Sequence, residues 1–384
     1  MYKWLMGVVL CGLMSGRVMA VAPETMVVEP LCKATVAWNQ TGALNAFVDL
    51  GMGYPCGCDM LAWGQVAVHY GLSLGYPAAT WLPTPVTSDV ALYDHRGNLI
   101  NFEQRTTLPG PYNWNDIRDQ KPAASRLMRD LGALGHTAYR PGATSGTLGN
   151  RGFTKYFDYK GEGYKLTMPL GNGRLIQENW PQVITASVRG SLQAGAPTVL
   201  GILTKTGGHM IVCDGFGYDA EGKEVIHLHY GWGAESGKWL PMSWFWTIGT
   251  REDEFQALFF NVHPQPLKGI VAGRVTREGR GVSGAQLKLI LAADAAQDVT
   301  APTFKDVVTT DAVGAYCFTG VEPGATYTLI VEEAGQRQEH TITIDEFVDD
   351  DLRAKRQDQW ENEHGKDGTY IPLSTGNTIL DITL

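Results

Sequence analysis

The sequence GCDMLAWGQVAVHYG, residues 57–71, predicts a helix with a cysteine in its first turn. A glycine-rich approach precedes Cys58, no proline follows before Gly71, and Gly71 is the expected C-terminal stop. A helix N-terminus has unpaired N–H groups and a partial positive charge, and both stabilise a thiolate. We therefore expect a lowered pKa for Cys58 and a role as nucleophile. The alternative is a small, inert, buried cysteine.

Residues 1–20 have the pattern of a secretory signal peptide: Lys3, a short apolar run, and small residues up to Ala20. The run is too short to span a bilayer, and no later stretch is long enough, so we expect a secreted or extracytoplasmic protein without a transmembrane segment. Only residues 21–37 separate the expected cleavage site from Trp38. We therefore expect no folded prodomain.

The length of 384 residues suggests at least two domains. Charged residues make up 18% of the chain, against roughly 25% in a typical soluble protein. The formal net charge is −9, and it becomes −11 when Lys3 and Arg17 leave with the signal peptide. This charge argues against nucleic acids and anionic membrane surfaces as partners.

Residues 21–263 read as an α+β domain, because helical patterns come first and strand patterns follow. The residues between 72 and 115 are rich in Pro, Thr, Asn and Tyr and predict a long surface excursion. A turn is expected at residues 214–217. The predicted helices begin at Pro122 and at Trp180, and the predicted strands are Thr198–Leu203, His209–Cys213 and Val225–Tyr230.

Composition changes near residues 264–266, and residues 267–384 predict an all-β sandwich domain. Residues 348–368 are highly charged and predict an insertion or loop. The expected strands are Ile270–Val275, Ala285–Leu291, Val307–Thr310, Ala315–Phe318, Tyr327–Val331, His340–Ile344 and Ile379–Leu384.

Hydrolysis of an acyl bond by a thiol needs a nucleophile, a general base, and donors for the developing oxyanion. Cys58 is the candidate nucleophile, and His209 is the best candidate base. Gly207 and Gly208 precede His209 and would let a substrate backbone pass close to the imidazole. The alternative for His209 is a structural histidine in a core strand.

The other cysteines and histidines leave several possibilities open. Five cysteines remain after the signal peptide, and this odd number indicates at least one free thiol. Cys32 and Cys56 could form a disulfide, and Cys56 with Cys58 could be a redox pair. A metal site is a weaker alternative, because the spacing matches no zinc signature, so we expect no metal and no cofactor. Its ligands would be His209, Cys213, His227 and His229.

Several short motifs in this order resemble the streptopain family of secreted bacterial cysteine proteases. Those around the two candidate catalytic residues are Gly57-Cys58 followed by Gln65, Gly207-Gly208-His209 followed by Asp214-Gly215, and Gly231-Trp232-Gly233. Three more segments are also similar to the family: Trp38-Asn39-Gln40, Tyr112-Asn113-Trp114-Asn115 and Ser145-Gly146-Thr147.

This resemblance implies a papain-like, two-lobed α+β fold and endopeptidase activity on protein or peptide substrates. It implies that Cys58 is the nucleophile and His209 the base, and that Gln40 donates to the oxyanion beside the main-chain N–H of Cys58. It also implies that a third group holds the imidazole. The family usually has Asn there, and this chain has His229.

The same resemblance implies four substrate-binding positions. Gly208 and Thr147 would line the path of the substrate backbone. Tyr230 and Trp232 would form an aromatic wall near His209.

The C-terminal residues resemble a carboxypeptidase-regulatory-like or Cna-type sandwich, through turns such as Gly281-Val282-Ser283-Gly284 and Val321-Glu322-Pro323-Gly324. Such a domain implies a spacer, or contact with a surface or another protein. The alternative function for the whole chain is a catalytically inactive papain-like scaffold used for binding or adhesion.

Overall fold

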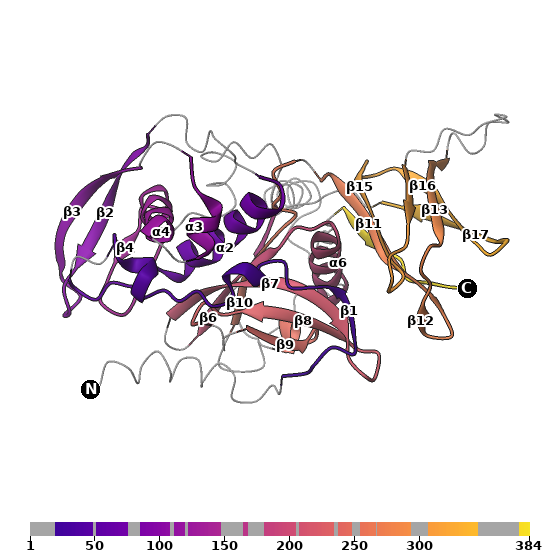
Figure 1. Ribbon diagram of the computed structural model, residues 1–384, viewed down its shortest axis with the longest axis horizontal. Coiled ribbons are helices and arrows are strands. Elements are labelled where there is room, and N and C mark those ends of the chain that lie inside the picture. The colour runs from indigo at the N-terminus through magenta and orange to yellow at the C-terminus, as the bar shows by residue number, and fades with distance from the viewer. Residues whose placement is uncertain are drawn as a thin grey trace, which may run out of the picture.

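The computed structural model is a mixed, strand-rich α/β structure (Figure 1). Most of the expected signal peptide, the charged stretch 348–368 and Thr147 lie outside the described residues. None of the helices in the described part of the chain has the length and apolar character needed to cross a membrane. The described residues are 20–48, 51–75, 85–107, 111–119, 122–146, 164–167, 180–204, 207–233, 237–247, 254–265, 267–292, 306–344 and 376–384.

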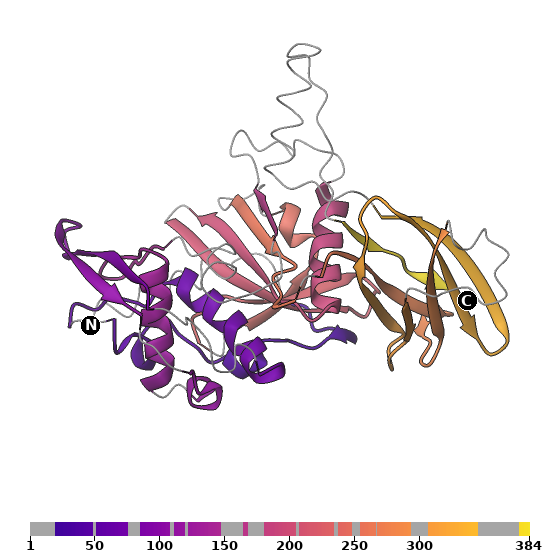
Figure 2. The same cartoon turned by 90° about the horizontal axis from the view of Figure 1, so that it is seen from above.

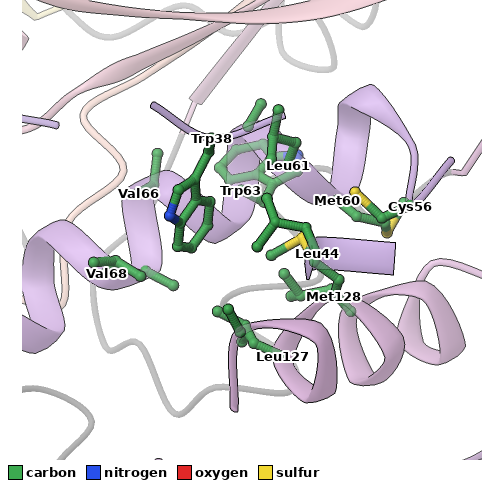
Figure 3. Packing of buried hydrophobic residues seen from close by; sticks show 14 of the residues in the cluster. Trp38, Leu44, Cys56, Met60, Leu61, Trp63, Val66, Val68, Leu127 and Met128 are labelled. Carbon is green, nitrogen blue, oxygen red and sulfur yellow. The ribbon is translucent and has the colours of Figure 1, made fainter. Parts of the chain in front are cut away.

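The first part of the chain is built around helix α2 (Cys58–Ser73), which is apolar on nearly all sides and therefore buried. Figure 3 shows Leu127 and Met128 of α4 (Pro122–Leu134) pointing towards α2. Gly64 allows this close approach, since a Cβ there would lie 2.4 Å from the Met128 Cε. The other elements of this part are η1 (Lys33–Thr35), η2 (Gly42–Asn45), α3 (Trp114–Arg118), β2 (Thr87–Tyr93), β3 (Leu99–Thr106) and β4 (Ala138–Tyr139).

A seven-stranded antiparallel sheet forms the middle of the molecule, as far as the described residues show. Its order is β5-β10-β6-β7-β8-β9, with β1 also paired to β7, and α2 packs against β7. Helix α6 (Trp180–Gln193) packs on the sheet through Ile184, Val188 and Leu192. The strands are β1 (Thr25–Val28), β5 (Tyr164–Thr167), β6 (Thr198–Thr204), β7 (Gly207–Tyr218), β8 (Glu224–His229), β9 (Gly237–Pro241) and β10 (Glu254–Phe260), and α7 (Trp244–Thr247) follows β9.

The last part of the chain consists of two sheets that share one apolar core. One sheet has the order β12-β11-β15, with β18 and β19 paired in parallel to β11, and the other has the order β14-β13-β16-β17. Most of the observed strands agree with those predicted, but the predicted closing strand Ile379–Leu384 is two short strands, and the strand predicted at His340 begins at Gln336. The observed strands are β11 (Gly269–Arg277), β12 (Arg280–Gly281), β13 (Gln286–Leu291), β14 (Asp306–Thr309), β15 (Ala315–Val321), β16 (Thr326–Glu333), β17 (Gln336–Thr343), β18 (Asn377–Ile379) and β19 (Ile382–Thr383).

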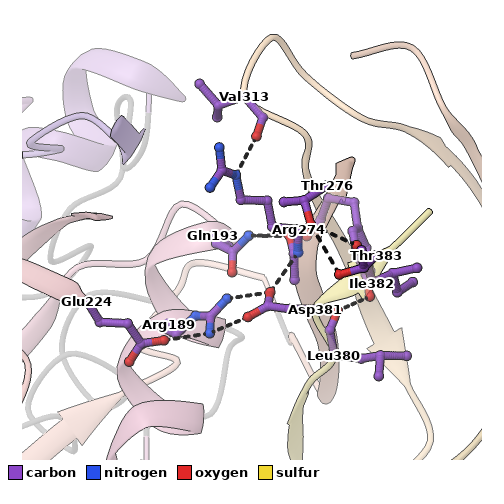
Figure 4. A network of polar contacts seen from close by, with 12 residues as sticks. Arg189, Gln193, Glu224, Arg274, Thr276, Val313, Leu380, Asp381, Ile382 and Thr383 are labelled. Atoms are coloured by element: carbon purple, nitrogen blue, oxygen red, sulfur yellow. Dashed lines mark hydrogen bonds and ion pairs between the residues drawn. The ribbon is translucent and has the colours of Figure 1, made fainter. Parts of the chain in front are cut away.

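Helix α6 stands between the large sheet and the two C-terminal sheets (Figure 2). Figure 4 shows its polar contacts with the C-terminal strands. Arg189 binds Asp381 through two hydrogen bonds of 3.0 and 2.8 Å, and Gln193 donates to the Gly273 carbonyl. An apolar cluster that includes Leu267 and Ile270 lies at the same junction. The C-terminal strands are therefore fixed to this helix.

Three local predictions were wrong. Gly71 does not end α2, which continues to Ser73. A Cβ on Gly71 would lie only 2.2 Å from Trp114, so this glycine serves close packing. The stretch 72–115 contains the hairpin β2–β3 rather than only a surface excursion. Residues 214–217 continue strand β7 with an irregular register instead of forming a turn.

Candidate active site

Cys58 is the first residue of α2 and lies where α2 meets β7. Gly57 before it has φ of +102°, and a Cβ there would lie 3.0 Å from the Thr144 Cγ2. A side chain at Gly57 would therefore be strained and crowded. The main-chain N–H of Met210 is near enough to the Cys58 sulfur to lower the pKa of the thiol. Met210 follows His209, so the two candidate catalytic residues come together at one junction.

Burial raises the pKa of the Cys58 thiol to about 11. The Met210 N–H and the first N–H groups of α2 lower this pKa, and the charge of Asp59 raises it. The predicted lowering by the helix N-terminus is therefore not observed, because loss of water around the sulfur outweighs it.

His209 lies on β7 and is buried, with 6% of its surface exposed. Its Nε2–H donates to the Tyr230 carbonyl at 2.9 Å, since a carbonyl can only accept. Its ring stacks on Trp232, with centroids 5.7 Å apart and planes at 13°. Burial lowers the pKa of His209 to about 4, although the Tyr230 carbonyl raises it. At neutral pH the imidazole is uncharged, and its Nδ1 carries a lone pair that can accept a proton.

The contact that orients His209 is the main chain of Tyr230, where the sequence predicted the side chain of His229. The His229 ring is bonded elsewhere: Nε2 to the Val36 carbonyl at 2.6 Å and Nδ1 to Gln65 at 2.8 Å. His229 is the last residue of β8, and Tyr230 directly follows it. The main-chain carbonyl of Tyr230 therefore meets His209, while the ring of His229 is held by Val36 and Gln65.

Gln40 reaches the same junction from the N-terminal side. Its carbonyl accepts the Cys56 N–H at 2.8 Å, and the neighbouring Asn39 forms a β-bridge with Trp232. The Gln40 side chain is 3% exposed, and its Nε2 has no hydrogen-bond partner among the described residues. A buried amide donor without an acceptor is costly unless a ligand supplies the acceptor.

The predicted substrate-binding residues have different surroundings. Gly208 is exposed, and a Cβ there would meet only the Ile202 carbonyl at 3.9 Å, so space lies open beside it. The side chain of Tyr230 is in the core of the large sheet, and Trp232 lies against His209. Thr147 is not described, but Gly146 before it packs against Met60 of α2.

The remaining cysteines and histidines have structural surroundings. Cys32 and Cys56 are free, buried thiols, so the possible disulfide between them is absent. His227 pairs with Asp214 at 2.6 Å in the interior. Among the described residues, no group of three or more His, Cys, Asp and Glu side chains is arranged to hold a metal ion.

Sequence reasoning missed three contributors to this junction: the Met210 N–H, the Tyr230 carbonyl and the Gln65 side chain. The first two are main-chain groups, which any residue type could supply. Gln65 belongs to the motif that begins at Cys58, so its spacing was a usable signal.

Comparisons with known proteins identify the family of this chain. The peptidase C10 family profile matches residues 38–240, which is more than half of the chain. A search of curated proteins finds no match. The active wild-type interpain A cysteine protease of Prevotella intermedia is similar at 17% identity and a TM-score of 0.45, over 64% of this chain and 99% of that one.

Two pilus proteins are also similar, more weakly. The pilus 2b backbone protein of group B streptococcus has 14% identity and a TM-score of 0.19, over 49% of this chain and 76% of that one. BcpA, the major pilin subunit of Bacillus cereus, has 11% identity and a TM-score of 0.16, over 46% of this chain and 37% of that one. The family match, which spans both Cys58 and His209, is the decisive finding: the chain belongs to the peptidase C10 family and is a cysteine-type peptidase.

Proposed function

We propose that this peptidase is a secreted bacterial endopeptidase that cleaves peptide bonds in proteins through Cys58, His209 and an acyl-enzyme intermediate. The observation that carries the proposal is the buried Gln40 amide, whose Nε2 has no partner among the described residues. The main-chain carbonyl of Gln40 accepts the Cys56 N–H, two residues before Cys58, so Gln40 belongs to the segment that adjoins the nucleophile.

The reaction begins when the Cys58 sulfur attacks the substrate carbonyl and its proton passes to Nδ1 of His209. The main-chain N–H of Cys58 and the Nε2–H of Gln40 stabilise the oxyanion. His209 then gives the proton to the leaving amine, and water, activated by the same imidazole, releases the acyl group. The Tyr230 carbonyl keeps Nε2 protonated, which leaves Nδ1 as the base.

The substrate backbone would run past Gly208 and Thr147, and Trp232 would flank it on the histidine side. The open space beside Gly208 supports this path. Tyr230 contributes its main-chain carbonyl to the site and its side chain to the core.

The fold supports a papain-like arrangement, with a helical lobe carrying Cys58 and a sheet lobe carrying His209 over residues 21–263. For residues 267–384 we propose a carboxypeptidase-regulatory-like or Cna-type β-sandwich that acts as a spacer or contacts a surface or another protein. The two sheets around one core support it. Secretion rests on the signal-peptide pattern of residues 1–20.

The test is labelling of the mature protein with an epoxysuccinyl thiol-protease inhibitor, followed by peptide mapping. We expect one adduct on Cys58, no adduct in Cys58→Ala, and loss of peptide hydrolysis in that variant. Cys317→Ala is the matched control, because Cys317 is partly exposed and lies in the C-terminal strands. An unlabelled Cys58 in the folded, reduced protein would favour a catalytically inactive scaffold used for binding or adhesion.

A further inference from the structure

We infer that His229 is a positioning residue for the oxyanion donor Gln40, acting through the segment 31–40, and that it does not orient the base His209. The inference rests on the proposed function and adds a role for a residue that the resemblance places beside the base. We call residues 31–40 the N-terminal strap.

Side chains from α2 and β8 hold the carbonyl groups of the strap. His69 contacts the Leu31 carbonyl at 3.1 Å, and Gln65 donates to the Thr35 carbonyl at 3.2 Å. His229 contacts the Val36 carbonyl at 2.6 Å, the shortest of the three. The strap is thus fixed to both lobes four residues before Gln40.

The far end of the strap carries Gln40 into the site. The Trp38 side chain is fully buried, and its carbonyl accepts the Gly233 N–H at 2.9 Å. Gln40 follows two residues later and is held by the Cys56 N–H. Any shift of the strap at Val36 is therefore passed along a short, packed segment to the oxyanion donor.

The hydrogen bonds also fix the tautomer of His229. The Val36 carbonyl can only accept, so the His229 Nε2 carries the hydrogen. The Nδ1 then accepts from Gln65 Nε2, whose other hydrogen goes to the Thr35 carbonyl. Both amide hydrogens of Gln65 are used, and the neutral His229 ring donates one hydrogen bond and accepts another. Burial lowers the pKa of His229, which agrees with a neutral ring.

This geometry separates two roles for His229 experimentally. A residue that orients His209 affects every reaction of the Cys58 sulfur, because it affects proton transfer. A residue that positions Gln40 affects only reactions that develop an oxyanion. Alkylation by iodoacetamide occurs at a methylene carbon and expels iodide, so it needs the sulfur and the base but no oxyanion donor.

The experiment compares His229→Leu, which removes the donor to Val36, with His229→Gln, whose amide can donate to the same carbonyl. Cys317→Ser is the common background, so that the partly exposed Cys317 does not react. We expect His229→Leu to lower kcat for peptide hydrolysis at least tenfold, with the alkylation rate of Cys58 within twofold of the parent. We expect His229→Gln to recover most of kcat.

A double variant gives an independent readout. In a Gln40→Ala background, His229→Leu should cost less than a further twofold in kcat, because the donor that it positions is gone. The inference is overturned if His229→Leu slows the alkylation of Cys58 as much as it lowers kcat, or if it leaves kcat unchanged. It is also overturned if the kcat losses of Gln40→Ala and His229→Leu multiply in the double variant. A parent protein that hydrolyses no peptide refutes the proposed function itself, and the inference with it.

Discussion

Replacing Asp381 by Ala should destabilise the peptidase by about 2 kcal/mol, although Asp381 lies far along the chain from Cys58. Asp381 holds the Arg189 guanidinium through two hydrogen bonds and also accepts the Arg274 N–H at 2.9 Å (Figure 4). Burial by itself lowers the pKa of Arg189, yet Asp381 and Glu224 leave this pKa above its ordinary value. Their attraction therefore outweighs the cost of burying the charge.

The magnitude follows from the exposure of the partners. The Arg189 side chain is 4% exposed, and removing one partner from a fully buried pair costs about 3–5 kcal/mol. Asp381 is 47% exposed, and exposed pairs contribute about 0.2–1 kcal/mol. Arg189 also retains Glu224 at 2.7 Å. An intermediate loss of about 2 kcal/mol is therefore expected.

Urea unfolding followed by tryptophan fluorescence measures this loss. Glu322→Ala is the matched control, because it breaks the ion pair with Lys268, in which both side chains are more than half exposed. We expect a clearly smaller loss for the control. Equal losses in the two variants would refute the reasoning that burial at the junction with α6 gives the Asp381 contacts their strength.

Three further outcomes are expected. Gln40→Ala should lower kcat about 10²–10³-fold, because it removes an oxyanion donor, and steady-state kinetics with unchanged kcat would contradict the role. Gly71→Ala should lower the free energy of unfolding by about 1–3 kcal/mol, because the added methyl group overpacks against Trp114. Gly208→Ala has open space beside it, so it should leave thermal unfolding unchanged but weaken peptide hydrolysis. The kcat/KM profile should fall as the pH drops below about 4, because protonation of His209 removes the base, and a limb near 6.5 would contradict the effect of burial.

Much of the architecture could be predicted because glycine and proline at element ends, and the periodicity of apolar residues, are local signals. Gly57 and Pro122 mark helix starts, and turn residues separate the strand patterns of the C-terminal part. The hairpin β2–β3 was missed because β3 is exposed on nearly every residue, so it has no alternation to detect. Gly71 was misread because a helix stop and a close contact both select glycine, and the contact residue, Trp114, lies far away in the sequence.

The site was predictable in its residue types but not in its electrostatics or its main-chain contacts. The helix N-terminus at Cys58 is a local feature, whereas the burial that raises its pKa depends on tertiary packing, which includes the contact of α2 with the distant strand β7. The role of position 229 depends on which carbonyl its ring meets. The His229 ring meets the Val36 carbonyl, and the Tyr230 carbonyl meets His209. Every residue type presents a carbonyl group, so the sequence holds no record of this pairing.

The pKa shifts of the catalytic pair bear on how catalysis starts. Burial raises the pKa of the Cys58 thiol to about 11 and lowers the pKa of the His209 imidazole to about 4, so both shifts favour the uncharged forms. On the proposed mechanism, the thiolate therefore forms as the sulfur attacks. The negative charge then passes directly to the substrate oxygen, so the proposal makes the position of the Gln40 amide, and hence of the N-terminal strap, decisive for the barrier.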